Sequence, residues 1–117
     1  RKGCFFLAKY TRHLTGNFSQ ILNKIHDGIM NGSVSASFEE SEDFDKDGVR
    51  CAVRVYERYS YFGGNRVSLN VTLFGADGDV DLCAVTSGGS QAMFFKINTV
   101  GEENFLQCLI DIVNDLD

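Results

Sequence analysis

The sequence predicts an α+β domain of two layers, in which an antiparallel β-sheet meander carries two helices packed on one face. Two segments, 18–30 and 99–116, repeat apolar residues at helical spacing. The segments around and between them alternate apolar and polar residues with a period of two, which is typical of strands. Short breaks rich in glycine favour hairpins, which pair strands antiparallel. We therefore expect the order β-α-β-β-β-β-β-α in one domain that spans residues 1–117.

A strand and a helix open the predicted fold. Apolar and aromatic residues dominate 4–14, which predicts a strand, and a break follows at 15–17. Asn17 or Ser19 is placed to cap the helix, because short polar side chains accept hydrogen bonds from its first free amides. Gly28 is expected to weaken the last helical turn, since glycine is a poor helix former.

The strand predicted over 49–61 has the clearest alternation in the chain. It follows a shorter strand over 33–38, which the acidic segment 39–47 is expected to end. One side of the longer strand is apolar, which predicts that it faces the helices: Val49, Cys51, Val53 and Val55. The other side is expected to face away from them: Arg50, Ala52, Arg54, Tyr56 and Arg58.

Three further strands and a helix complete the predicted fold. Strands are predicted over 67–73, 80–87 and 91–97, each with apolar residues at alternate positions. Thr99 and Glu102 have the spacing of a capping box, which opens the last helix. This order of elements resembles that of the helix-grip and TATA-box-binding-protein-like folds, and the resemblance implies a fold without a function.

The acidic balance of the chain argues against two classes of partner. The formal net charge is −5 and the pI is about 4.9. Proteins that bind nucleic acid or anionic membranes present basic surfaces, so neither partner is expected. No stretch approaches the roughly 20 apolar residues that cross a bilayer, and we expect a cytoplasmic protein. The sequence contains no cofactor motif, and no cofactor is expected.

The sheet face opposite the helices is the first candidate site. The predicted alternation places Arg50, Arg54, Tyr56 and Arg58 there, beside the hydroxyl and amide side chains of the next strand. Arginine and tyrosine are enriched where proteins bind one another. This favours a non-enzymatic domain that binds a protein partner, or forms a homo-oligomer, through the open face. The same residues also suit a solvated face, where arginine and threonine fit a strand.

The glycine-rich end of the meander is the second candidate site. Polar and aromatic residues flank its two turns: Arg58, Tyr59, Tyr61, Asn65, Arg66, Ser87, Ser90 and Gln91. Backbone amides of such loops can hold an anion. The alternative function is therefore a small-ligand binder or weak enzyme, with its site here or between the sheet and the helices. Tight hairpins use the same glycines for their geometry alone.

Two acidic turns at the opposite end form a candidate calcium site. Three aspartates match the first half of a calcium-binding loop: Asp43, Asp45 and Asp47. Arg54, however, occupies the place of its last glutamate. The second acidic turn, with Asp77, Asp79 and Asp81, should lie at the same end, because alternate hairpin turns of a meander share an end. Solvated turns also favour aspartate and glycine for backbone reasons, so both interpretations stay open.

Residues that could carry catalysis are few, and none is assigned. His13 and His26 are the only histidines, and neither falls in a metal or triad motif, so structural roles are expected. The alternation of its strand places Glu57 on the inward side, where a carboxylate can act as a base. A bulge or the exit of the strand from the core would explain the same position.

None of the four cysteines lies in a zinc pattern: Cys4, Cys51, Cys83 and Cys108. Their even number permits two disulfides, and three N-x-S/T triplets are compatible with a secreted protein. Cys51 and Cys83 fall in apolar strand patterns, however, where a free thiol acts as a small hydrophobe. Reduced cysteines are therefore expected.

Two stretches, 48–75 and 86–105, carry a family resemblance. The first contains Tyr-Phe-Gly-Gly-Asn and the second contains Thr-Ser-Gly-Gly-Ser. Together they resemble an uncharacterised family of small bacterial proteins, found mainly in Firmicutes and clostridia and classed as a domain of unknown function. The resemblance implies a bacterial, cytoplasmic protein whose N-x-S/T triplets are chance matches. It implies no activity, cofactor or catalytic residue.

Overall fold

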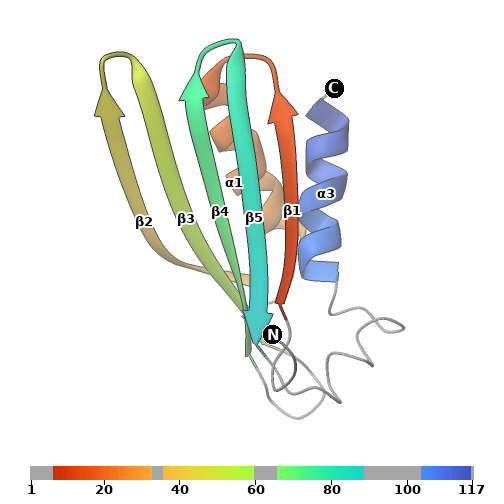
Figure 1. The fold of residues 1–117 in the computed structure, drawn as a ribbon. Coiled ribbons are helices and arrows are strands. Elements are labelled where there is room, and N and C mark those ends of the chain that lie inside the picture. The colour runs from red at the N-terminus through yellow and green to blue at the C-terminus, as the bar shows by residue number, and fades with distance from the viewer. Residues whose placement is uncertain (1–6, 33–35, 60–65, 89–103, 117) are drawn as a thin grey trace.

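A computed structural model describes residues 7–32, 36–59, 66–88 and 104–116 of the chain. The described part contains five strands: β1 (Leu7–Leu14), β2 (Ala36–Lys46), β3 (Val49–Tyr59), β4 (Arg66–Ala76) and β5 (Asp79–Gly88). Two helices accompany them: α1 (Phe18–Gly32) and α3 (Asn104–Leu116) (Figure 1). The predicted α+β class with an antiparallel sheet is therefore confirmed. The strand predicted over 91–97 lies outside the described residues.

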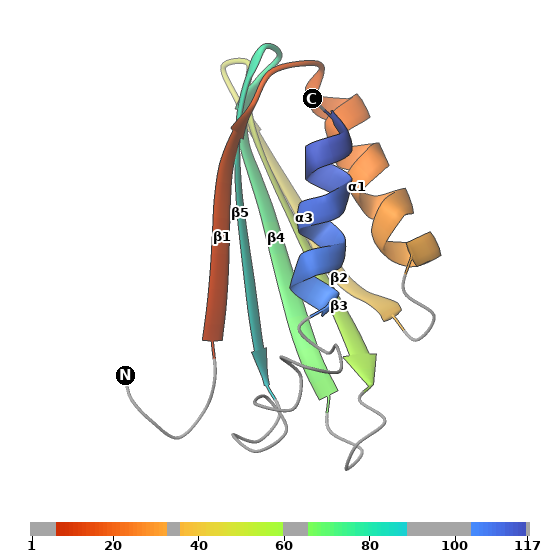
Figure 2. The same cartoon turned by 90° about the vertical axis from the view of Figure 1, so that its right-hand side faces the viewer.

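The sheet has the strand order β1-β5-β4-β3-β2, so β4 is its middle strand. Every neighbouring pair is antiparallel. Strands β2 to β5 follow one another in sequence, and β1 joins the far side of β5. Both helices lie on the same face of the sheet, as predicted (Figure 2). Neither is long and apolar enough to cross a membrane.

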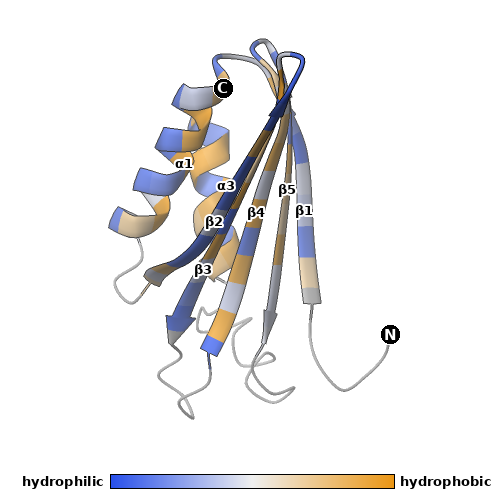
Figure 3. Ribbon diagram, turned by 90° about the vertical axis from the view of Figure 1, so that its left-hand side faces the viewer, coloured by the Kyte–Doolittle hydropathy of each residue, from blue (hydrophilic) through white to orange (hydrophobic). Residues whose placement is uncertain are grey.

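The core lies between the helices and the middle of the sheet. The residues of β4 that point toward the helices are almost fully buried: Val67, Leu69, Val71 and Leu73. The other buried apolar residues of the sheet's centre and the helices are Val80, Leu82, Ala84, Phe18, Ile21, Leu22, Ile25, Ile29, Phe105, Leu109 and Val113. Figure 3 shows apolar sides of the helices turned toward the sheet. The predicted apolar stripes of α1 and α3 thus become one layer of the core.

The acidic segment 39–47 forms most of a strand instead of ending one, which corrects the prediction. β2 continues through it, and the chain turns at Asp47 and Gly48, which have φ of 54° and 84°. A bulge between Phe38 and Glu40 interrupts the pairing with β3. The acidic side chains are tolerated because β2 is an edge strand of the described sheet, where charges prevent unwanted pairing. β2 is accordingly hydrophilic along most of its length (Figure 3).

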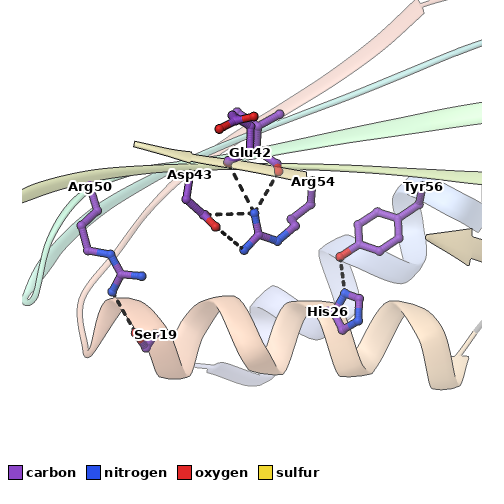
Figure 4. A network of polar contacts seen from close by, with 8 residues as sticks. Ser19, His26, Glu42, Asp43, Arg50, Arg54 and Tyr56 are labelled. Carbon is purple, nitrogen blue, oxygen red and sulfur yellow. Dashed lines mark hydrogen bonds and ion pairs between the residues drawn. The ribbon is translucent and has the colours of Figure 1, made fainter. Parts of the chain in front are cut away.

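The facing of β3 is the reverse of the predicted one. Ala52 and Tyr56 are its buried residues, and Arg54 lies between them on the side of α1 (Figure 4). Paired residues of antiparallel strands share a face. Ala52 pairs with Leu73 of β4, and Tyr56 pairs with Leu69, both of which belong to the core. The valines of β3 therefore point away from the helices.

Long side chains explain why the polar side of β3 faces inward. Arg50 reaches the hydroxyl of Ser19 in α1, and Tyr56 reaches the ring of His26 in the same helix (Figure 4). Such side chains fill the space between strand and helix with their apolar stems and place their polar tips at its rim. Valine is too short to span this gap.

Both a cap and a close helix contact position α1. Oδ1 of Asn17 accepts a hydrogen bond from the amide of Gln20 (2.9 Å), so the predicted cap at Asn17 is confirmed. Gly28 lies against α3, where an added Cβ would be 2.6 Å from Cδ1 of Ile112. The glycine that was expected only to weaken the helix therefore also lets the two helices approach closely.

Candidate functional site on the open face of the sheet

We call the sheet face away from the helices the open face. Alternate residues of all five strands form it: Lys9, Thr11, His13, Glu40, Glu42, Phe44, Val49, Cys51, Val53, Val55, Glu57, Ser68, Asn70, Thr72, Phe74, Asp79, Asp81, Cys83, Val85 and Ser87. Its large exposed apolar side chains are Phe44 (55% exposed), Phe74 (52%) and Val49 (41%). The half-buried valines of β3 lie beside the middle strand, whose residues on this face are polar except for Phe74. The open face thus carries apolar side chains along β3 and at Phe74, and the predicted arginine and tyrosine surface is wrong.

One row of residues crosses the whole open face through the register of the five strands. Its members pair in order from edge to edge: Glu40, Val55, Asn70, Val85 and Lys9. The row therefore has an acidic side chain at one end and a basic one at the other. Two valines lie between them, on either side of the amide of Asn70 on the middle strand. Both charged ends are exposed. We call it the central row.

A groove of about 400 Å³ lies over β1, β5 and β4. Its lining combines apolar, hydroxyl and ionisable residues: Thr11, Arg12, His13, Thr72, Phe74, Asp81, Leu82 and Cys83. Most of these side chains belong to the open face. The groove therefore gives this part of the face both a hollow and groups that can bind a ligand.

Within the described part of the chain, one imidazole and two carboxylates form a cluster beside this groove. Nδ1 of His13 lies 3.0 Å from Oδ1 of Asp81 and 3.6 Å from Oδ1 of Asp79. All three side chains are exposed. The hydrogen bond to Asp81 raises the pKa of His13 above its ordinary value, and the negative charges of both aspartates act in the same direction. The three ligating atoms lie within 4.8 Å of one another, an arrangement able to hold a metal ion.

Hydrogen bonds fix the chain around this cluster. The amide of Gly78, in the turn between β4 and β5, donates to the carbonyl oxygen of Gly16 (2.7 Å). The amide of Phe18 donates to Oδ1 of Asp77 in the same turn (2.8 Å). Asp77 therefore caps α1 from a distant part of the sequence. The connection that follows β1 is thus tied to the turn that precedes β5.

The predicted open-face arginines lie on the helix side instead. Arg50 donates to Oγ of Ser19 (2.8 Å), and its guanidinium lies 4.4 Å from the centre of the Phe18 ring. Arg54 forms an ion pair with Asp43 (3.0 Å) while only 14% of its side chain is exposed (Figure 4). These contacts hold β2, β3 and α1 together, which is a structural role.

Tyr56 is buried and forms a hydrogen bond with His26. The hydroxyl oxygen and Nδ1 of the imidazole are 2.7 Å apart (Figure 4). Phe38 packs against both rings, with centroids 4.9 Å from His26 and 5.5 Å from Tyr56. Burial raises the pKa of Tyr56 to about 12. The predicted structural role of His26 is consistent with this aromatic cluster.

A second groove, of about 440 Å³, lies between α1 and α3. Arg58 of β3 lines it together with Cys108, Asp111 and Asp115 of α3. The guanidinium of Arg58 lies 5.9 Å from the centre of the Phe105 ring, and burial raises the pKa of the Cys108 thiol. This is the described hollow closest to the ligand site predicted between sheet and helices.

Glu57 lies on the open face, so its predicted inward position is wrong. It forms an ion pair with Arg66, whose guanidinium also lies 3.7 Å from Glu39. The hydroxyl groups of Ser87 and Ser68 are 3.2 Å apart on the neighbouring strands. These pairs tie β2 to β5 together near the glycine-rich end.

The rest of the glycine-rich site lies outside the described residues. This applies to the side chain of Tyr59 and to Tyr61, Asn65, Ser90 and Gln91.

Cys51, Cys83 and Cys108 are free thiols.

The aspartates of the predicted calcium site are dispersed. Asp43 and Asp45 lie in β2, and Asp47 lies in the turn that follows. Asp77 caps α1, and Asp79 belongs to the cluster with the imidazole. The two acidic turns do share one end of the sheet (Figure 1). No cluster of three metal-ligating groups found in the described ranges includes an aspartate of β2.

Sequence reasoning missed the cluster of His13 with Asp79 and Asp81. Part of its signal is present in the sequence, because Asp79 and Asp81 alternate in a strand and so share a face. The missing step is the pairing of β1 with β5, which places His13 directly opposite Asp81.

Comparison with known proteins identifies the family of the chain. Residues 7–117 match a family of unknown function, DUF6054. The chain belongs to this family. The predicted resemblance to a domain of unknown function is therefore confirmed, and the family supplies no activity. No curated protein matches the sequence.

Among solved structures, the crystal structure of Ara h 8.0201 is similar to this chain. The likeness covers 93% of this chain and 99% of that one, at 9% sequence identity and a TM-score of 0.36. A likeness this distant carries no inference about function.

Proposed function

We propose that this domain self-associates as a symmetric dimer through its open face. The central row carries the proposal, because it is complementary to itself. A two-fold axis along β4 places the row of one copy over the same row of a second copy in reverse order. Glu40 then faces Lys9 of the second copy, and Val55 faces its Val85.

The exposed apolar side chains of the open face support the same arrangement. Phe74 is half exposed. Because it lies on β4, along which the axis runs, it faces Phe74 of the second copy. Exposed apolar surface of this kind marks protein interfaces, and two sheets pack face to face when their inner sides are apolar. Val53 and Cys83 of the next row also come to face one another across the dimer.

Charge favours this axis over the other way to stack two copies. An axis across the strands would place β2 over β2 of the second copy, so that the strand with Glu40 and Glu42 would oppose its own acidic residues. Like charges across an interface are unfavourable, whereas opposite charges at its rim fix the register. The acidic β2 also disfavours edge-to-edge pairing through its own backbone.

A charge swap tests the proposed dimer. Lys9→Glu and Glu40→Lys each replace two attractive pairs per dimer by repulsive ones, and the double variant restores attraction with reversed signs. We expect each single variant to raise the dimer Kd by about tenfold and the double variant to return most of the affinity. Analytical ultracentrifugation over a protein concentration series at low salt measures the Kd.

Lys24→Glu is the matched control, because it makes the same charge change at an exposed position of α1. Its dimer Kd should stay at the wild-type value. A wild-type chain that stays monomeric at every concentration would contradict the proposal. So would single variants that dimerise as tightly as the wild type.

The alternative function, binding of a small ligand, has the groove between α1 and α3 in its favour. Arg58 and the carboxylates of Asp111 and Asp115 line it together, and they would suit a ligand that carries both a negative and a positive charge. It ranks second because the buried residues beneath the helices are closely packed, and Glu57 points away from that side.

A further inference from the structure

We propose that His13, Asp79 and Asp81 form a binding site for a divalent transition-metal ion, with Zn²⁺ as the best fit. All three ligands come from one chain, but they lie on the open face that the proposed dimer would cover, so metal binding and dimerisation are measured separately. It differs from the calcium site predicted between the two acidic turns, because it combines aspartates of the second turn with an imidazole and uses no aspartate of the first.

Two distances between the ligating atoms are close to those around one shared ion. Two ligands that bind a zinc ion at about 2.0–2.1 Å lie roughly 2.8–3.4 Å apart at octahedral or tetrahedral angles. Nδ1 of His13 is 3.0 Å from Oδ1 of Asp81 and 3.6 Å from Oδ1 of Asp79. All three ligating atoms lie within 4.8 Å of one another, and rotation of the exposed carboxylates would bring their oxygens closer to complete the coordination.

The scaffold holds the three ligands from two paired strands. His13 lies directly opposite Asp81 in the register of β1 and β5, and Asp79 precedes Asp81 by two residues on the same face. Buried neighbours anchor both strands at this level, because Leu14 is 2% exposed and Val80 is fully buried. The backbone of the site is therefore preorganised before an ion binds.

A second set of contacts fixes the two strands relative to one another. The hydrogen bonds from Gly78 to Gly16 and from Phe18 to Asp77 tie the end of β1 to the turn before β5. These contacts lie within a few residues of all three ligands. A site whose ligands come from a tied pair of strands loses little conformational freedom when it binds.

The donor set selects the class of metal. Imidazole nitrogen suits zinc, copper, nickel and iron, whereas calcium and magnesium take oxygen ligands almost exclusively. One nitrogen and two carboxylate oxygens also leave positions for water or for a further ligand. Catalytic and exchangeable zinc sites characteristically have three protein ligands and an open position.

The groove lies next to the open coordination positions of such an ion. His13 and Asp81 line it, so an ion held by them lies at the border of a hollow of about 400 Å³. Its remaining lining includes Phe74 and the hydroxyls of Thr11 and Thr72. A small ligand with a metal-binding group and an apolar body would fit this combination.

Titration of the full chain with Co²⁺ and Zn²⁺ tests the site. Co²⁺ replaces Zn²⁺ in such sites and reports its ligands through visible absorption, and calorimetry measures the Zn²⁺ affinity. We expect one ion per chain, with affinity for Ca²⁺ and Mg²⁺ at least tenfold weaker. His13→Ala and Asp81→Asn should each weaken Zn²⁺ binding by at least tenfold.

Two control variants make the test specific. Asp45→Asn removes an exposed carboxylate of β2 and should leave the affinity unchanged. Cys83→Ser removes the one thiol in the groove and should also leave it unchanged. All variants must retain the wild-type circular dichroism, which we expect because the three ligands are exposed. The proposal is overturned if Zn²⁺ does not bind at millimolar concentration, if His13→Ala binds it as tightly as the wild type, or if Cys83→Ser abolishes binding.

Discussion

Neighbouring strands β3 and β4 both alternate apolar and polar residues in sequence, yet the apolar side faces the helices in β4 and faces away from them in β3. The apolar side of β4 faces the helices, and its residues Val67, Leu69, Val71 and Leu73 are at most 1% exposed. The apolar side of β3 faces away, and its inward side carries arginines around Ala52 and Tyr56. An alternating pattern thus gives the period of a strand, while the neighbouring layer decides which side faces inward.

The difference follows from what covers each strand. Short branched side chains of β4 meet the apolar stripes of α1 and α3 directly. On β3, Arg50 and Tyr56 reach α1 through long side chains with polar tips. The consequence is functional, because the valines displaced from the core are the ones that make the open face apolar.

The largest expected difference between the strands concerns their apolar residues. Leu69→Ala in β4 should lower the free energy of unfolding by about 2–5 kcal/mol, since it leaves a cavity in a fully buried position. Val53→Ala in β3 should lower it by less than about 1 kcal/mol, because Val53 is only partly buried on the open face. Urea unfolding in the Lys9→Glu background, at protein concentrations below its dimer Kd, measures both without a contribution from self-association. Equal losses would contradict the assignment of the two sides.

The second prediction concerns the helix pair that covers β4. Gly28→Ala brings a Cβ to 2.6 Å from Cδ1 of Ile112, and the overpacking should destabilise the chain by about 1–2 kcal/mol. In an Ile112→Ala background the clash is gone, and the same change should stabilise the chain by up to about 1 kcal/mol through helix propensity. Urea unfolding of all four chains forms a double-mutant cycle. A substitution that has the same sign in both backgrounds would rule out the close contact.

Most of the fold could be predicted from the sequence because local patterns specify it. The apolar spacing of α1, the cap at Asn17 and the turn at Gly48 are local signals, and each agrees with the structure. The acidic segment could not be placed in a strand, because its charges suit solvent as well as a strand at the edge of a sheet. That edge position becomes visible only once the strand order is known.

The candidate site was less predictable because it depends on pairing between distant segments. His13 and Asp81 are 68 residues apart in sequence, and only the pairing of β1 with β5 brings them together. The central row depends likewise on the register of all five strands. Arg50, Arg54, Tyr56 and Arg58 were named correctly as a group on one side of β3, but that side faces the helices, and Arg54 pairs with Asp43 of β2.

The smallest expected effect tests the polar contact on the inward side of β3. Tyr56→Phe removes the hydrogen bond to His26 and should lower the free energy of unfolding by about 1 kcal/mol at neutral pH. It should also change the alkaline limb of the stability profile. Burial raises the pKa of Tyr56 to about 12 in the folded chain, above the value of about 10 for an exposed tyrosine.

The sign of that pH dependence follows from proton binding. Between about pH 10 and 12 the unfolded chain loses the Tyr56 proton while the folded chain keeps it, so stability must fall as the pH rises through this window. The contribution is fully present below the unfolded pKa and is absent from Tyr56→Phe. Urea unfolding at intervals of pH should therefore give a shallower alkaline slope for Tyr56→Phe than for the wild type. Identical slopes would mean that Tyr56 is exposed. The valines of β3 would then face the helices, as the alternation of the strand predicts.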